Sequence, residues 1–196
     1  MKRRELAVAL AATALLAACG KENSAPSGST GGSPAAGTPV SIEAIEGGAK
    51  GFNVGSAMAA RVVYVFFDAQ CPHCAALWEA AKPLKGQARF VWIPVGLIGE
   101  KSVSQGGAIL AASDPSATMD QHEASLRAQQ GGIAAMNVPD AQKDVVKKNT
   151  ELFTKFGFGG VPTVVAKHPQ SGELVTLEGS MPTAMLAQKL GLSAPS

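Results

Sequence analysis

Two cysteines, Cys71 and Cys74, flank the dipeptide Pro72-His73 in the stretch FFDAQCPHCAALW. On a helix this spacing places the two side chains one turn apart, so their sulfurs can form a reversible disulfide bond, a structural crosslink or half of a metal site. Which of these chemistries applies depends on the elements that position the two sulfurs.

A buried strand precedes the pair and a helix follows it. Residues 61–67 (RVVYVFF) are continuously β-branched and aromatic, which is typical of a strand buried on both faces. The helix is expected from about Cys71 toward Lys85, with Pro72 in its first turn and Pro83 kinking or ending it. Cys71 therefore falls where unpaired backbone N–H groups and the helix dipole favour the thiolate over the thiol.

This placement predicts different roles for the two sulfurs. Cys71 is expected to be the exposed thiolate and the nucleophile. Cys74 shares a helical face with Leu77, so we expect it to be shielded and to resolve a mixed disulfide. His73 would lower the pKa of Cys71 further if its imidazole donates a hydrogen bond or carries a proton, and Pro72 stiffens the turn. Alternatively, His73 is a solvated helix-start residue without influence.

The other expected elements alternate between strands and helices, as in an α/β protein. They are a strand at 89–95, helices at 102–112, 115–128 and 140–156, a strand pair at 163–166 and 174–177, and a last helix from about Pro182. Trp78 and Trp92 are expected to pack in the core, and Met181 and Met185 to pack along one face of the last helix.

Several of these stretches match a known family. The CPHC motif after a buried strand, the helix interrupted at Pro83, the helical insertion and the later GVPT of residues 160–163 resemble thioredoxin-fold proteins, in particular the periplasmic Dsb thiol-disulfide interchange proteins. The resemblance covers about residues 61–191 and is greatest to the catalytic domain of the DsbG and DsbC members, whereas the Pro-His dipeptide is similar to DsbA. It implies an α/β thioredoxin-like fold with a central mixed sheet and a helical insertion at about 102–156.

The resemblance also implies an activity and a set of site residues. Cys71 would be the attacking thiolate, Cys74 the resolving thiol, and Pro162 a cis-proline facing the pair, where the alternative is an ordinary trans proline that starts a strand. Val161 would offer its backbone to an extended substrate segment. The reaction is dithiol-disulfide exchange on exported proteins, needs no cofactor, and depends on a membrane redox partner that recharges the pair.

Two departures from the family pattern affect these expectations. Val65 stands where thioredoxin has a buried carboxylate, and Asp68 is either a proton acceptor or a cap or turn residue. DsbC and DsbG carry an amino-terminal dimerisation domain, whereas residues 40–60 have room for one added strand at most. We therefore expect a monomer with weak isomerase activity.

The first 39 residues predict export and lipid anchoring. A basic start and a short apolar segment within residues 1–18 are typical of a signal peptide, and the sequence LAAC ending at Cys19 resembles the lipobox of bacterial lipoproteins. Cys19 would then carry the lipid, and Gly20 after it favours the outer over the inner membrane. Residues 19–39 are rich in Gly, Ser and Pro and predict a flexible tether, followed by one domain at 40–192.

Charge and cysteine use limit the remaining function classes. Of the 17 basic and 15 acidic residues, removal of the signal leaves 14 of each, and no basic stripe indicates a nucleic-acid partner. A structural disulfide across so short a loop would gain little entropy. A copper-binding or metal-transfer lipoprotein using the same cysteines is the other alternative, although His122 and His168, expected to be solvated, have no spacing relation to the pair. We predict no metal site.

Overall fold

The computed structural model describes residues 38–194. The predicted signal peptide at 1–18, the predicted lipidation site Cys19 and nearly all of the tether at 19–39 lie outside the described residues and stay predictions. Within the described part of the chain, no helix is both long and apolar enough to cross a membrane.

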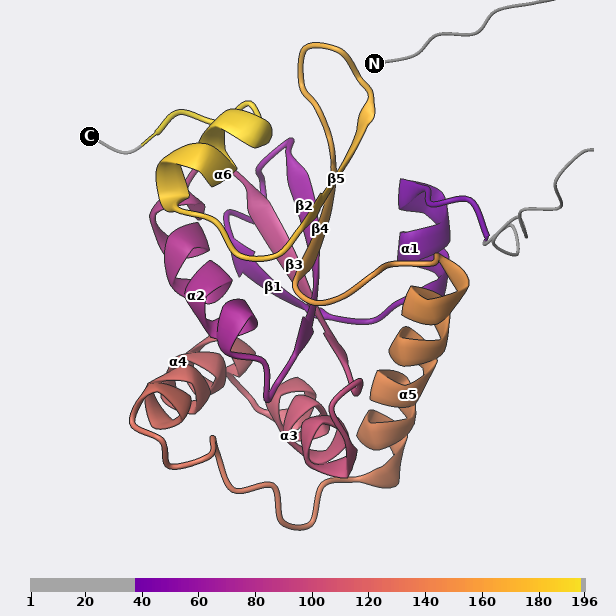
Figure 1. Cartoon of the computed structure of the whole chain (residues 1–196), viewed down its shortest axis with the longest axis vertical. Helices are drawn as coiled ribbons and strands as arrows, with labels where there is room; N and C mark the ends of the chain where they lie inside the picture. The colour runs from indigo at the N-terminus through magenta and orange to yellow at the C-terminus, as the bar shows by residue number, and fades with distance from the viewer. Residues whose placement is uncertain (1–37, 195–196) are drawn as a thin grey trace, which may run out of the picture. The chain divides into compact units, whose positions relative to one another are not determined.

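A five-stranded mixed sheet forms the centre of the fold, with the strand order β1-β3-β2-β4-β5 (Figure 1). β2 is central: it pairs in parallel with β3 and antiparallel with β4, as the mixed sheet expected from the sequence requires. β1 and β5 are the antiparallel edge strands. The bounds are β1 Phe52–Gly55, β2 Val62–Asp68, β3 Arg89–Val95, β4 Thr163–Lys167 and β5 Leu174–Glu178.

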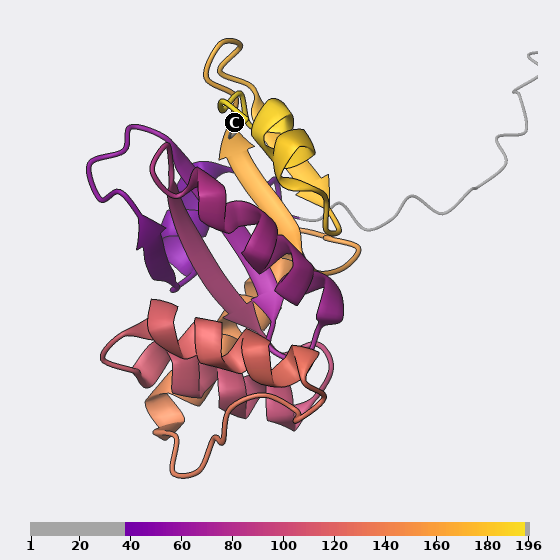
Figure 2. The same ribbon diagram turned by 90° about the vertical axis from the view of Figure 1, so that its left-hand side faces the viewer.

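Helices cover both faces of the sheet. In Figure 1, α2 and α6 lie on one face, α1 and α5 on the other, and α3 and α4 pack at the end where β2 leads into α2. Figure 2 shows α3 and α4 at the same end from the side. The bounds are α1 Ile42–Gly48, α2 Pro72–Ala81, α3 Glu100–Ala111, α4 Pro115–Arg127, α5 Asp140–Lys155 and α6 Thr183–Lys189.

Successive side chains of β2 pack into the apolar cores on opposite faces of the sheet, because side chains alternate across a strand. Phe67 faces α2, where the rings of Trp78 and Trp92 meet edge to face at 4.9 Å. Phe66 faces the other way and packs against Phe153 of α5 at 5.8 Å. The packing role predicted for both tryptophans is confirmed, and α2 is fixed by a continuous apolar face.

The expected strands and helices are present with bounds close to those predicted. Pro83 does end α2: Lys82–Leu84 continues only as a 3-10 turn. β1 is the added strand for which residues 40–60 had room, but α1 was not predicted. The prediction for Met185 is wrong, because 48% of this residue is exposed, and Met181 precedes α6 rather than lying on it.

Candidate active site

Cys71 is the N-cap residue of α2, directly after the loop that follows β2. Pro72 occupies the first turn of the helix, where its missing N–H is no loss. The backbone N–H of Cys74 donates to the Cys71 carbonyl at 3.0 Å. Both cysteines are free thiols; Cys74 is fully buried and Cys71 is 6% exposed. Cys71 is therefore the more accessible of the two, but it is not the openly exposed residue that the sequence suggested.

The surroundings of the two cysteines shift their pKa values in opposite directions. The pKa of Cys71 is lowered to about 6. The largest cause is a hydrogen bond that the Cys74 thiol donates to the Cys71 sulfur; burial opposes it, the backbone N–H groups of Cys74 and His73 add to the lowering, and the charge of Asp68 opposes it. Burial, followed by the nearby Cys71 sulfur, raises the pKa of Cys74. At neutral pH the pair therefore holds one thiolate, on Cys71, and one thiol, on Cys74.

His73 contributes to this site through its main chain. Its side chain is exposed, and its ring Nδ1 lies 3.4 Å from the hydroxyl of Ser180, in the loop before α6. The N–H that lowers the pKa of Cys71 belongs to the backbone of His73. An effect of the imidazole ring on Cys71 stays a prediction.

The loop before β4 brings residues distant in sequence to the dithiol. The Val161–Pro162 peptide bond is cis, as the family resemblance implied. The sulfur of Cys71 lies 3.6 Å from the carbonyl oxygen of Val161, and Pro162 is buried beside it. Substrate binding by the Val161 backbone stays a prediction.

Asp68 has the turn role, one of the two roles that the sequence left open. Its buried carboxylate accepts from the backbone N–H groups of Gln70 at 2.8 Å, Leu97 at 2.7 Å and Ile98 at 3.0 Å. These bonds tie the loop after β3 to the loop that carries Cys71. Asp68 thus positions the N-terminus of α2.

His122 lies on α4 and is fully buried, so the prediction that it is solvated is wrong. Its Nε2–H donates to the Ala69 carbonyl at 2.5 Å, and its Nδ1 accepts from the Ile133 backbone at 3.2 Å. Burial lowers its pKa, which agrees with a neutral ring that uses both nitrogens. The ring ties α4 to the loop just before Cys71.

Glu123, the next residue, was missed by the sequence reasoning. Its side chain is fully buried, and neither carboxyl oxygen has a hydrogen-bond partner among the described residues. The available signal was periodicity: Met119, His122, Glu123 and Leu126 lie three and four residues apart, so they form one helical stripe. This stripe faces the interior despite its two polar members.

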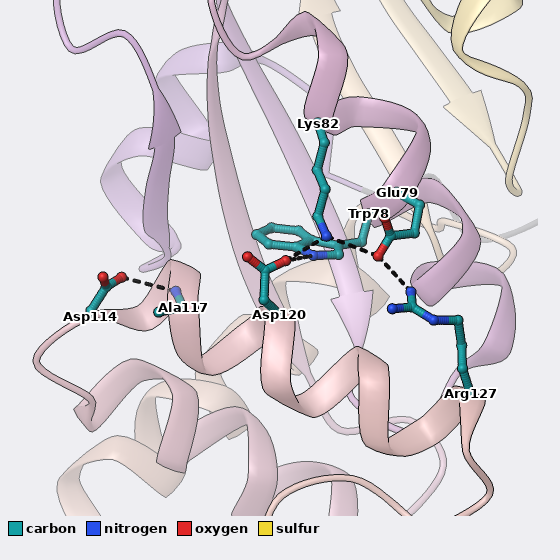
Figure 3. Close-up of polar contacts among 7 residues, drawn as sticks. All are labelled: Trp78, Glu79, Lys82, Asp114, Ala117, Asp120 and Arg127. Atoms are coloured by element: carbon teal, nitrogen blue, oxygen red, sulfur yellow. Dashed lines mark hydrogen bonds and ion pairs between the residues drawn. The ribbon is translucent and has the colours of Figure 1, made fainter.

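An ion-pair network joins α4 to α2 beside these buried residues (Figure 3). The Trp78 indole N–H donates to Asp120 at 2.9 Å, and Lys82 lies 2.6 Å from the same carboxylate. Further along, Arg127 pairs with Glu79 at 2.5 Å. These contacts hold α2 against α4 along one side.

The described residues contain no cluster of three or more His, Cys, Asp or Glu side chains that could hold a metal ion. His122 uses both ring nitrogens in the core, and His168 lies in the β4–β5 hairpin, where it accepts from Ser171 at 3.5 Å. The metal alternative therefore has only the two sulfurs as ligands in this part of the chain.

The sequence of this chain is similar to those of two curated proteins. The chain is 32% identical over 139 residues to the thiol:disulfide interchange protein DsbG of Pseudomonas aeruginosa, covering 70% of this chain and 54% of that protein. It is 35% identical over 109 residues to the DsbG of Escherichia coli, covering 53% of this chain and 42% of that protein. The chain thus spans about half the length of the curated relatives it matches.

A solved structure extends the similarity to the fold. The catalytic domain of Proteus mirabilis ScsC superimposes with a TM-score of 0.59 at 19% identity, covering 76% of this chain and 92% of that one. The family defined by the thioredoxin-like domain matches residues 54–193, well over half of the chain. The helix-start cysteine pair, the mixed sheet and this match together show that the chain belongs to the thioredoxin-like domain family.

Proposed function

We propose that this protein is a thiol-disulfide oxidoreductase that acts on exported proteins by dithiol-disulfide exchange through its CPHC pair. One observation carries the proposal: at the N-terminus of α2 a single thiolate and a single thiol lie side by side. Cys71 has a pKa of about 6, while Cys74 is fully buried with a raised pKa. Both DsbG relatives are named as thiol:disulfide interchange proteins, which supports the same chemistry.

The exchange proceeds in two steps. The Cys71 thiolate attacks one sulfur of a client disulfide, forming a mixed disulfide and releasing the other client sulfur as a thiolate. Cys74 then loses its proton and attacks the Cys71 sulfur, which releases the second client thiolate and leaves the Cys71–Cys74 disulfide. The client gains two electrons and the pair loses two; oxidation of a client runs the same steps in reverse.

The low pKa of Cys71 makes the oxidised pair a good acceptor of electrons. A thiolate stabilised in the reduced state is also a better leaving group when the disulfide is attacked, so the pair exchanges rapidly and favours its reduced form. His73 and Pro72, together with Val161 and Pro162, are proposed as site residues. Val161 would pair its backbone with an extended client segment.

The proposal places the protein in the periplasm, attached to the outer membrane through a lipid on Cys19. A membrane redox partner would recharge the pair. The basic and apolar start of the chain and the lipobox-like LAAC support this placement. Replacement of Cys19 by Ser should move the protein from the membrane to the soluble fraction and abolish fatty-acid labelling, whereas retention in the outer membrane would contradict the anchor.

We further propose that the lipid-free protein is a monomer with weak isomerase activity. The apolar residues of the 40–60 segment support this, since Ile45 of α1 and Phe52 of β1 are buried within the fold instead of forming a separate apolar surface. Sedimentation together with refolding of a scrambled multi-disulfide substrate tests it. A stable dimer with strong reshuffling would contradict it.

Trapping tests the proposed chemistry directly. The Cys74→Ala variant keeps the nucleophile and lacks the resolving thiol, so it should accumulate mixed disulfides with exported clients. Cys71→Ala is the matched control and should accumulate none. Equal trapping by both variants, or by neither while the wild type exchanges freely, would contradict the assignment of the two roles.

A further inference from the structure

The carboxyl group of Glu123, on the helix that packs against α2, is buried without any hydrogen-bond partner among the described residues. A buried polar group without a partner costs free energy, so its presence in a well-packed core calls for a reason. The exchange described above leaves one group unassigned: the acceptor of the proton that Cys74 releases.

Two neighbours on α4 show which way Glu123 points. Asp120, Glu123 and Arg127 are spaced by three and four residues, so they share one helical face. Asp120 bonds to Trp78, and Arg127 to Glu79, both on α2 (Figure 3). Glu123 lies between them on the same face, and its side chain is therefore directed toward α2.

The facing part of α2 carries the resolving thiol. Cys74 and Trp78 are one turn apart on the buried face of α2, and Trp78 is the residue that Asp120 holds. The preceding residue, His122, contacts the Ala69 carbonyl, two residues before Cys71. The segment of α4 that bears Glu123 thus contacts both the helix that bears Cys74 and the loop that leads to Cys71.

The elements that pack against α4 are α2, α3 and β1. The sequence of β1, FNVG, has no charged or titratable groups. Those of α2 with its N-cap and the 3-10 turn after it, of α3 and of α4 itself are Cys71, His73, Cys74, Glu79, Lys82, Glu100, Lys101, Asp120, His122 and Arg127. Burial first, and then the negative charges of Cys71 and Glu79, raise the pKa of Glu123 to about 8, against the opposing effect of Arg127 and Lys82.

We propose that Glu123 accepts the proton of Cys74 when the mixed disulfide is resolved and returns it when the pair is reduced; this rests on the proposed exchange function. In the forward step, the Cys74 S–H proton passes to the Glu123 carboxylate as the Cys71–Cys74 bond forms and the bond between Cys71 and the client sulfur breaks. The client leaves as a thiolate, and the glutamic acid holds the proton. In reverse, the acid protonates Cys74 as it leaves the disulfide.

The charge on Cys71 gates this transfer. In the reduced pair, burial first and then the negative charge of the Cys71 thiolate favour the protonated form of Glu123. In the mixed disulfide Cys71 is neutral, the repulsion is gone, the pKa of Glu123 falls, and its proton passes to water. The carboxylate therefore becomes available as a base at the stage when Cys74 must lose its proton.

A single-turnover experiment tests the role. Wild type and Glu123→Gln are prepared with glutathione as a mixed disulfide on Cys71, and release of glutathione is followed as a function of pH, while attack of the reduced proteins on oxidised glutathione measures the first step. General base catalysis contributes about 10²–10⁴-fold in many enzymes. We expect resolution in Glu123→Gln to slow at least about tenfold at neutral pH and to lose an inflection in its pH profile, with the first step little changed.

Asp114→Ala is the matched control for disturbance of α4. Asp114 caps this helix by accepting from the Ala117 N–H at 3.0 Å (Figure 3), and its loss should destabilise the protein without changing the pH profile of resolution. Equal slowing in both variants, or an unchanged profile in Glu123→Gln, would overturn the proposal. If Glu123→Gln fails to fold, Glu123→Asp, which keeps an acid in the same place, should retain the inflection; its absence there would also overturn it.

A second readout does not depend on turnover. Infrared difference spectra of wild type should show a protonated carboxyl that loses its proton near neutral pH when Cys71 is blocked as a methyl disulfide, and Glu123→Gln should lack this signal. If the protonation of this carboxyl is the same with Cys71 free and with Cys71 blocked, the proposed control of Glu123 by the charge of Cys71 is wrong. A wild type that fails to exchange yet shows the coupled carboxyl would contradict the proposed function while leaving the electrostatic coupling intact.

Discussion

Replacing the resolving thiol should change the acidity of the nucleophile, because the Cys74 thiol is the largest single cause of the low Cys71 pKa. Cys74→Ala removes this hydrogen-bond donor. Cys74→Ser is the matched variant, since its hydroxyl keeps a donor of similar size at the same position. The two variants differ mainly in whether the Cys71 thiolate is hydrogen-bonded from the side chain one turn below it.

The size of the effect follows from the hydrogen bond. A bond to a charged group contributes roughly 1.5–3 kcal/mol, and one pKa unit corresponds to about 1.4 kcal/mol. In Cys74→Ala the pKa of Cys71 should therefore rise from about 6 by roughly one to two units, so that the thiolate is no longer dominant at neutral pH. In Cys74→Ser it should stay close to the value that Cys71 has in the wild type.

The assay is the ultraviolet absorbance of the thiolate as a function of pH, checked by the rate of alkylation. His73→Ala completes the set: alanine keeps the backbone N–H at this position, so the pKa of Cys71 should move less than in Cys74→Ala. A rise as large as that of Cys74→Ala would show that the imidazole ring matters, as the sequence suggested. Equal pKa values in Cys74→Ala and Cys74→Ser would refute the reasoning.

Three further changes should have measurable effects. The pKa of Glu123 is raised from 4.5 to about 8, so the folded state binds an extra proton between these pH values and loses stability as the pH rises through them. In denaturant unfolding, the free energy of unfolding of Glu123→Gln should increase relative to that of wild type by up to about 3 kcal/mol from pH 5 to pH 7. Asp68→Asn should lower the pKa of Cys71, because it removes a nearby negative charge, yet destabilise the fold by about 2 kcal/mol because one carboxylate oxygen that accepts from backbone N–H groups is lost; absorbance titration and unfolding would check the two effects. Gly51→Ala should destabilise β1 by about 1–3 kcal/mol in the same unfolding assay, since its Cβ would lie 2.3 Å from the Trp92 carbonyl oxygen.

The sequence was most informative where local signals agreed. The uninterrupted apolar run of β2, the proline at the start of α2 and the cysteine before it all mark one junction, and the structure has it at those residues. Pro83 ends α2 because proline removes a donor and clashes with the preceding turn. α1 was missed because it is short and ends in two glycines, although Ser41 caps it by accepting from Ala44 at 3.1 Å.

The parts of the site that were missed depend on tertiary packing. Polar side chains at 122 and 123 suggested a solvated helix, and only the tertiary packing around α4 buries them. Asp68 shows the same limit: its position was noticed, but the backbone N–H groups it binds come from the loop after β3, about 30 residues later. Burial and partner choice over such separations are not encoded in any short pattern.

The contact between the Cys71 sulfur and the Val161 carbonyl spans 90 positions of the chain. Synthesis runs from the N-terminus, so both cysteines emerge well before α4, and α4 before the loop that carries Val161. A nascent chain that ends before residue 115 holds both cysteines without His122, Asp120 or Arg127 to fix α2. The site around the pair is therefore completed late in biogenesis, when the loop that carries Val161 comes to lie against Cys71.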